Sequence, residues 1–290
     1  MLQLTTEVLS SQYTSMSSEN ITTWFEYRLS TVITQIDTEI LNGFSIQVGC
    51  GSSKAFVQAL SVAYGRTGDS NRQDVLDYLL NSLDNGTKCT DTEATSLSFI
   101  ESSFGNYFSL VSYEEIISYY SEFDAFESGV LQLMTTTQIG DLFVTANVYE
   151  SIEKTTTLFV YLRNLSVENV NIFMTQFTEI AIKKNISITN EVGQFILQSY
   201  LTIIKTHVQS ASREYLVQLF TYRLTILIRF FTTETLLIFA IKDCDTLVLV
   251  VLYLDQGING MSLATKNNIA AWIIGILRSL GQNGKCSKYA

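Results

Sequence analysis

Four cysteines, Cys50, Cys89, Cys244 and Cys286, are the residues of this chain whose chemistry and spacing are most informative. None lies in a C-x-x-C pair and the chain has a single histidine, so a zinc site is not expected. Cys50 and Cys89 are 39 residues apart (89 minus 50), and Cys244 and Cys286 are 42 apart (286 minus 244). The two intervals are similar, although four cysteines still permit three pairings.

The two cysteine intervals occupy the same place in an internal repeat. Shifting the sequence by 195 residues (223 minus 28) aligns the segment around Arg28 with the segment around Arg223. Identical pairs in this register are Phe25/Phe220, Tyr27/Tyr222, Arg28/Arg223, Leu29/Leu224, Thr38/Thr233, Glu39/Glu234, Leu41/Leu236, Phe44/Phe239 and Ile46/Ile241. A match at a fixed period indicates tandem modules. We expect one complete module at 1–195 and the first part of a second, truncated module at 196–290, in a chain that is a fragment of a longer protein.

The repeat favours one cysteine pairing. Only Cys50–Cys89 with Cys244–Cys286 gives each module its own bridge, so these two disulfides are expected. Disulfides persist in oxidising compartments, which predicts a secreted or cell-surface protein. The alternative is four free thiols in a cytosolic protein.

Four Asn-x-Ser/Thr sequons are candidate glycosylation sites, at Asn20, Asn85, Asn164 and Asn185. The chain is rich in serine and threonine, so several such matches are expected by chance. Asn85 lies in a predicted turn beside Cys89, and we expect it to be the best acceptor of the four.

Other residues that could do chemistry form no recognisable active site. His207 is the only histidine and has no partnered nucleophile in its segment. An acidic cluster could suggest calcium, but it lacks the D-x-D-x-D-G spacing of an EF-hand loop. Its members are Glu114, Glu115, Glu122, Asp124 and Glu127; we expect Glu115 to cap a helix and the others to lie at solvated helix starts. The sequence therefore predicts a non-enzymatic protein with no metal and no cofactor.

Composition limits the remaining classes. The chain has 47% apolar and 16% charged residues and no proline, which fits a folded and closely helical protein. Its net charge of −10 argues against nucleic-acid partners. Its most apolar region, 224–254, is interrupted by charges, so no transmembrane segment is expected. The N-terminus shows neither a basic nor a long apolar segment, so no signal peptide is visible.

Apolar residues recur mostly at helical spacing, and strand-like alternation is rare. Capping-box patterns occur at Thr23/Glu26, Thr90/Glu93 and Ser112/Glu115. The segment Gly49-Cys50-Gly51 is expected to be a loop. Predicted helices cover about 25–36, 38–44, 56–64, 75–83, 97–104, 113–120, two short segments within 130–144, 155–163, 167–182, 188–207 and 212–230. The predicted fold is all-α, an α-solenoid of many short helices packed in sequence order.

Several segments resemble repeated modules of large vertebrate extracellular proteins related to the mesothelin, stereocilin and otoancorin group. They are Trp24–Leu29, Val48–Cys50, Phe56–Leu60, Lys88–Thr90, Ser103–Phe108 and Leu133–Ile139. The resemblance covers most of 20–145 and returns at 215–290. It implies an armadillo-like superhelix that is N-glycosylated, exposed at the cell surface and used in cell–matrix adhesion, with no active site. This chain departs from the family in lacking proline.

The expected function is therefore extracellular adhesion through an extended surface, with other glycoproteins or extracellular matrix as partners. The alternative is an intracellular α-solenoid scaffold that binds partner helices or peptides. Reduced cysteines and unmodified sequons would distinguish the second from the first.

Overall fold

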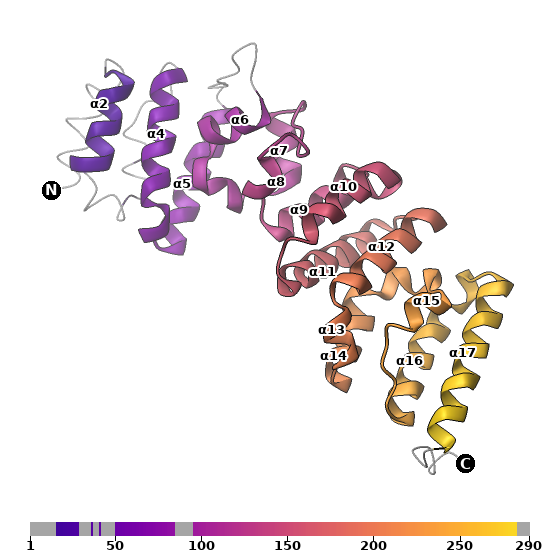
Figure 1. Cartoon of the computed structure of the whole chain (residues 1–290). Coiled ribbons are helices and arrows are strands. Elements are labelled where there is room, and N and C mark those ends of the chain that lie inside the picture. The colour runs from indigo at the N-terminus through magenta and orange to yellow at the C-terminus, as the bar shows by residue number, and fades with distance from the viewer. Residues whose placement is uncertain (1–15, 29–35, 37–40, 42–49, 85–94, 283–290) are drawn as a thin grey trace. The chain divides into compact units, whose positions relative to one another are not determined.

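A computed structural model of the chain describes residues 16–28, 36, 41, 50–84 and 95–282, and these residues form helices and no strand (Figure 1). The prediction of an all-α protein is confirmed for this part of the chain. The residues divide into two compact units, 1–138 and 139–290. Each unit is described by itself below.

The first unit begins with α2 (Ser18–Thr23), the π-helix η2 (Trp24–Arg28), α4 (Cys50–Ala63), the 3₁₀ turn η4 (Tyr64–Arg66) and α5 (Asp69–Asp84). Helix α4 packs against α2 on one side and against α6 (Ser96–Ser103) on another. Buried Ile21, Phe56, Leu60, Val75 and Tyr78 belong to the core between these elements. Removing such apolar surface from water is the main term that holds the helices together.

The rest of the first unit is built around aromatic side chains. It contains the 3₁₀ helix η5 (Gly105–Leu110), α7 (Tyr113–Tyr119), α8 (Val130–Leu133) and the start of α9 (Thr136–Thr145). Phe104 and Phe108 are almost fully buried, and Phe99 meets Phe104 edge to face with ring centroids 5.8 Å apart. The predicted split of 130–144 into two short helices is confirmed.

The buried side chain of Gln138 links the start of α9 to the end of η5 through hydrogen bonds. Its Nε2 donates to the backbone carbonyls of Phe108 and Val111, both at 2.6 Å. Its Oε1 accepts from the Thr135 backbone N–H at 2.7 Å, and Gln138 N donates to Thr135 Oγ1 at 3.2 Å. The pair is a capping box that starts α9, and the same side chain holds the end of η5.

The second unit contains the longer helices. In order these are η6 (Val148–Glu150), α10 (Ile152–Leu162), α11 (Val167–Lys184), α12 (Asn190–Ile203), α13 (Lys205–Gln209), α14 (Arg213–Gln218), the π-helix η7 (Leu219–Arg223), η8 (Thr225–Phe230), α15 (Thr233–Leu236), α16 (Cys244–Gln256), η9 (Ile258–Gly260) and α17 (Leu263–Gln282). Serine, threonine and aspartate side chains cap the starts of α10, α11, α12, α14, α15 and α16, at Ser151, Ser166, Thr189, Ser212, Thr232 and Asp243. Because each cap satisfies a free backbone N–H, short helices can follow one another without proline.

The sequence repeat has a structural counterpart. Helices α2 and η2 correspond in both bounds to α14 and η7 at an offset of 195, so both copies place a π-helix after a six-residue helix. The N-caps Ser17 and Ser212 are also equivalent, and each accepts from the backbone N–H three residues later. The starts of α4, η4 and α5 correspond to those of α16, η9 and α17 at an offset of 194. Among the described residues, five elements of the first copy therefore have counterparts in the same order in the second.

Several local predictions are wrong or lie outside the described residues. Thr23 ends α2 rather than starting a helix, because its hydroxyl donates to the Glu19 carbonyl at 2.9 Å inside that helix. Cys50 and Gly51 belong to α4, not to a loop. The single helix predicted over 212–230 is broken into α14, η7 and η8, because Leu224 N–H donates to the Leu219 carbonyl, five residues back. The predicted helix 38–44 lies almost wholly outside the described residues, and the Thr90/Glu93 capping box wholly outside them.

Candidate functional site

A pocket of about 450 Å³ lies in the second unit. Its walls come from α11, from His207 on α13 and from Arg223 at the end of η7; the α11 residues are Val167, Glu168, Asn171, Ile172, Thr175 and Gln176. The volume falls within the range of roughly 300–1,000 Å³ that is usual for small-ligand sites. Most of the lining side chains are polar, so the pocket suits a polar ligand.

Contacts with α11 and with the Tyr215 ring hold Arg223 in place. Its Nε donates to Thr175 Oγ1 at 3.4 Å, and its backbone carbonyl accepts from Thr178 Oγ1 at 3.1 Å. Its guanidinium carbon lies 5.9 Å from the centre of the Tyr215 ring, close enough for a cation–π interaction. The π-helix turn at Leu219–Arg223 is what brings this arginine against α11, since η7 and α11 pack together.

The buried Tyr200 and the half-buried Tyr215 lie near the same guanidinium. Tyr200 is fully buried and its hydroxyl donates to Asn171 Oδ1 at 2.7 Å. Burial raises the pKa of Tyr200 far above its usual value, and the nearby Arg223 opposes this only in part. Tyr200 is therefore neutral and does not balance the charge of Arg223. The Tyr215 hydroxyl and Arg223 Nη1 are buried without a hydrogen-bond partner.

Arg223 gives this pocket a position that can bind an anionic group of a ligand. No ion pair in the described part of the chain includes Arg223, and a guanidinium in this position binds carboxylate or phosphate groups well. His207 is exposed at the edge of the pocket, and its Nδ1 lies 3.4 Å from the neighbouring Thr206 hydroxyl. The lining thus offers a cation, Arg223, a carboxylate, Glu168, and neutral polar groups rather than a nucleophile paired with a base.

Reading the sequence alone missed this pocket. The only hint was the pair Arg28 and Arg223 within the repeat. Arg28 is exposed and lies over the Trp24 ring, 4.4 Å from its centre. The two arginines therefore share a position in their π-helices but have different surroundings, which only the packing of α11 decides.

The cysteines are described only in part. Cys244 begins α16, is buried and is disulfide-bonded. Cys50 begins the equivalent helix α4. Cys89 and Cys286, like the Cys50 side chain, lie outside the described residues, so the pairing of Cys50 with Cys89 and of Cys244 with Cys286 stays a prediction.

Three of the four candidate glycosylation sites lie on the described surface. Asn20 is exposed in α2, Asn164 is exposed after α10 and donates to the Val160 carbonyl at 3.2 Å, and Asn185 is exposed at the end of α11. Asn185 has a left-handed backbone with φ 49° and Ser187 is also exposed, as is Ser166 of the Asn164 sequon. Asn85 lies outside the described residues.

The acidic residues have structural roles. Glu115 forms the predicted capping box with Ser112, which is confirmed by bonds in both directions at 2.8 and 3.2 Å. Glu127 accepts from the backbone N–H of Ser96 at 2.7 Å, at the first turn of α6, and Asp124 accepts from Phe126 N–H at 2.9 Å. The prediction that Glu122, Asp124 and Glu127 lie at helix starts is wrong, since all three lie in the connection between α7 and α8. No group of acidic, histidine or cysteine residues in the described ranges could hold a metal ion.

No helix within the described ranges combines the length and apolarity needed to cross a bilayer. Comparison of the chain with protein-family models, with curated proteins and with solved structures finds no significant match.

Proposed function

We propose that this protein is a non-enzymatic helical-repeat protein of the cell surface or extracellular space, and that it acts in adhesion through an extended α-solenoid surface. The observation that carries the proposal is the correspondence of α2, η2, α4, η4 and α5 with α14, η7, α16, η9 and α17. Stacked helical repeats present long surfaces whose usual role is to bind other macromolecules. The resemblance to the mesothelin, stereocilin and otoancorin group supports the same role.

The disulfide at Cys244 supports the extracellular part of the proposal, because disulfides are rare in reducing compartments. The exposed sequons Asn20, Asn164 and Asn185 agree with it.

Each copy also presents an exposed tyrosine at the same position of its π-helix, Tyr27 and Tyr222, followed by Arg28 and Arg223. Tyrosine and arginine are enriched among the residues that dominate protein–protein binding energy. The Arg223 pocket beside Tyr222 would take an acidic side chain or an acidic sugar of the partner.

The test begins with the full chain expressed through a secretory pathway. Peptide mapping without reduction should find Cys244 in a disulfide, and glycosidase treatment should lower the mass. The secreted chain should then bind immobilised matrix glycoproteins, and Tyr222→Ala should weaken that binding, whereas Leu252→Ala on α16 should not. Free thiols, unmodified sequons and no matrix binding would instead favour the intracellular scaffold.

A further inference from the structure

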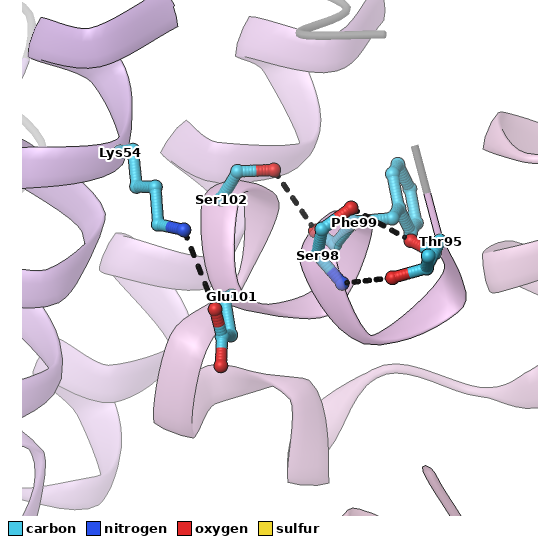
Figure 2. A network of polar contacts seen from close by, with 6 residues as sticks. All are labelled: Lys54, Thr95, Ser98, Phe99, Glu101 and Ser102. Atoms are coloured by element: carbon cyan, nitrogen blue, oxygen red, sulfur yellow. Dashed lines mark hydrogen bonds and ion pairs between the residues drawn. The ribbon is translucent and has the colours of Figure 1, made fainter. Parts of the chain in front are cut away.

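The first copy shows what covers the outer side of helix α4. The segment Ser96–Leu110, which comprises α6 and η5, packs on α4, and η5 also packs on α5. Figure 2 shows the start of α6, where Thr95 caps the helix, and the ion pair between Lys54 on α4 and Glu101 on α6, with 3.3 Å between Nζ and Oε2.

The start of η5 contacts α4 closely and through hydrogen bonds to Ser61. Asn106 donates from its backbone N–H to Ser61 Oγ at 3.0 Å and from its side chain to the Ser61 carbonyl at 2.9 Å. Gly105 has φ +51°, and a Cβ there would overlap the Ser61 hydroxyl and lie 3.1 Å from Ser61 Cβ. A glycine is required because the backbone approaches α4 so closely.

Aromatic packing completes the cover. The rings of Tyr64 and Tyr107 meet edge to face at 5.0 Å, and the Tyr64 hydroxyl lies 3.0 Å from Ser109 Oγ. Val57 is left only 3% exposed.

The second copy presents the same side of the helix without its cover. At the offset of 194, Lys54, Val57, Ser61 and Tyr64 correspond to Val248, Val251, Asp255 and Ile258 on α16 and η9. Val248 is 41% exposed, Ile258 is 39% exposed and Val251 is only half-buried.

We call Val248, Val251, Asp255 and Ile258 the uncovered face. By contrast, Val250, Leu254 and Trp272 are buried like their equivalents Phe56, Leu60 and Tyr78, so the inner side of α16 is complete.

We propose that the uncovered face is a docking surface for a further copy of the α6–η5 segment, supplied by another repeat of this kind. The occupant is a short amphipathic helix followed by a 3₁₀ turn that carries Gly-Asn and an aromatic residue. Asp255 replaces Ser61; its carboxylate accepts from the backbone N–H that Ser61 Oγ binds in the first copy, and its backbone carbonyl accepts from the asparagine amide. Val251 and Ile258 receive the apolar and aromatic side chains, whose burial supplies the affinity. The proposal does not depend on the compartment in which the protein works.

The test adds a copy of the α6–η5 segment to the full chain. Residues Thr90–Gln138 are joined after Cys286, the equivalent of Cys89, so that the added copy follows α17 in the register of the first copy. Amide hydrogen exchange should then slow roughly tenfold or more in α16 and at the exposed end of α17, because opening of these helices requires undocking. Val251→Lys should abolish this protection.

Leu252→Lys is the matched control. Leu252 is an exposed neighbour on α16 whose equivalent Gln58 stays exposed in the first copy, so its substitution should leave the protection unchanged. Both variants without the added segment should retain the circular dichroism of the parent chain.

A charge exchange tests whether the added segment docks on α16 in the same register as α6–η5 on α4. This test does not depend on the stability of Val251→Lys. Val248→Lys should keep the protection by pairing with Glu101 of the added segment, as Lys54 does in the first copy. Val248→Lys combined with Glu101→Lys in the added segment should lose it, since two like charges then meet. Unchanged exchange in α16 on adding the segment would overturn the proposal. The proposal would also be overturned if the original chain formed a dimer in which α16 is already protected from amide exchange. A second copy of the chain would then occupy the uncovered face.

Discussion

Replacing Gln138 by leucine should destabilise the first unit. The two side chains are close in size, so the change removes hydrogen bonds with little change in volume. Val111 O loses its 2.6 Å bond from the amide of Gln138, and Thr135 N–H loses its 2.7 Å acceptor. Phe108 O still accepts from Val111 N–H at 3.2 Å, so it keeps one partner.

The magnitude follows from these losses. A buried polar group left without a partner costs about 1–3 kcal/mol. Val111 O is buried and Thr135 is half-buried, so the sum for Gln138→Leu is roughly 2–4 kcal/mol. The loss should be confined to the first unit, where all these partners lie.

Amide hydrogen exchange of residues 96–111 in urea is the assay, because it reports this unit separately from the other. Gln138→Glu provides the control. Its carboxyl can accept from Thr135 in either protonation state, but it can donate to Val111 O only when protonated.

The carboxylate form of the Gln138→Glu variant is disfavoured by burial and by the two carbonyls, so the pKa of the introduced carboxyl in the folded state lies above its unfolded value. The stability of this variant should therefore be highest at acid pH and fall as pH rises through the folded pKa. A loss below about 1 kcal/mol for Gln138→Leu, or an equal loss in both units, would refute the assignment of Gln138 as the polar link between η5 and α9.

Three further predictions concern other parts of the fold. Gly193→Ala should destabilise the second unit by roughly 1–3 kcal/mol, since its Cβ would overlap the buried Phe230 ring, whereas Gly275→Ala on α17, with open space around it, should be neutral or stabilising in urea unfolding. Ser212→Ala should cost about 1 kcal/mol through loss of the α14 cap, measured as faster amide exchange in α14. Burial raises the pKa of Tyr78 to about 12, above its unfolded value of about 10. Because the folded state holds the proton more tightly, the free energy of unfolding should be constant below about pH 10 and fall between about pH 10 and 12. Tyr78→Phe should reduce that fall.

The sequence by itself determined the helical class and much of the local structure. Helical spacing of apolar residues predicted α10, α11 and α6 to within a few residues, because that spacing reflects one buried side of a regular helix. The Ser112/Glu115 cap was also visible, since a capping box needs only residues three apart. The internal repeat was visible for a similar reason, as equivalent positions keep equivalent side chains. The cysteine pairing and the family resemblance remain predictions.

Only the tertiary structure decided where the chain leaves the α-helical path and which side chains meet. The π-helix turns at η2 and η7 depend on packing against neighbouring helices, so a pattern of period 3.6 continued through 212–230 without a signal. Glu127 reaches Ser96 across 31 residues, and Arg223 reaches Thr175 across 48, distances that no local pattern encodes. The uncovered face is also a property of packing alone. Val57 and Val251 are the same residue type at equivalent positions, and their burial differs because a neighbouring segment covers only one of them.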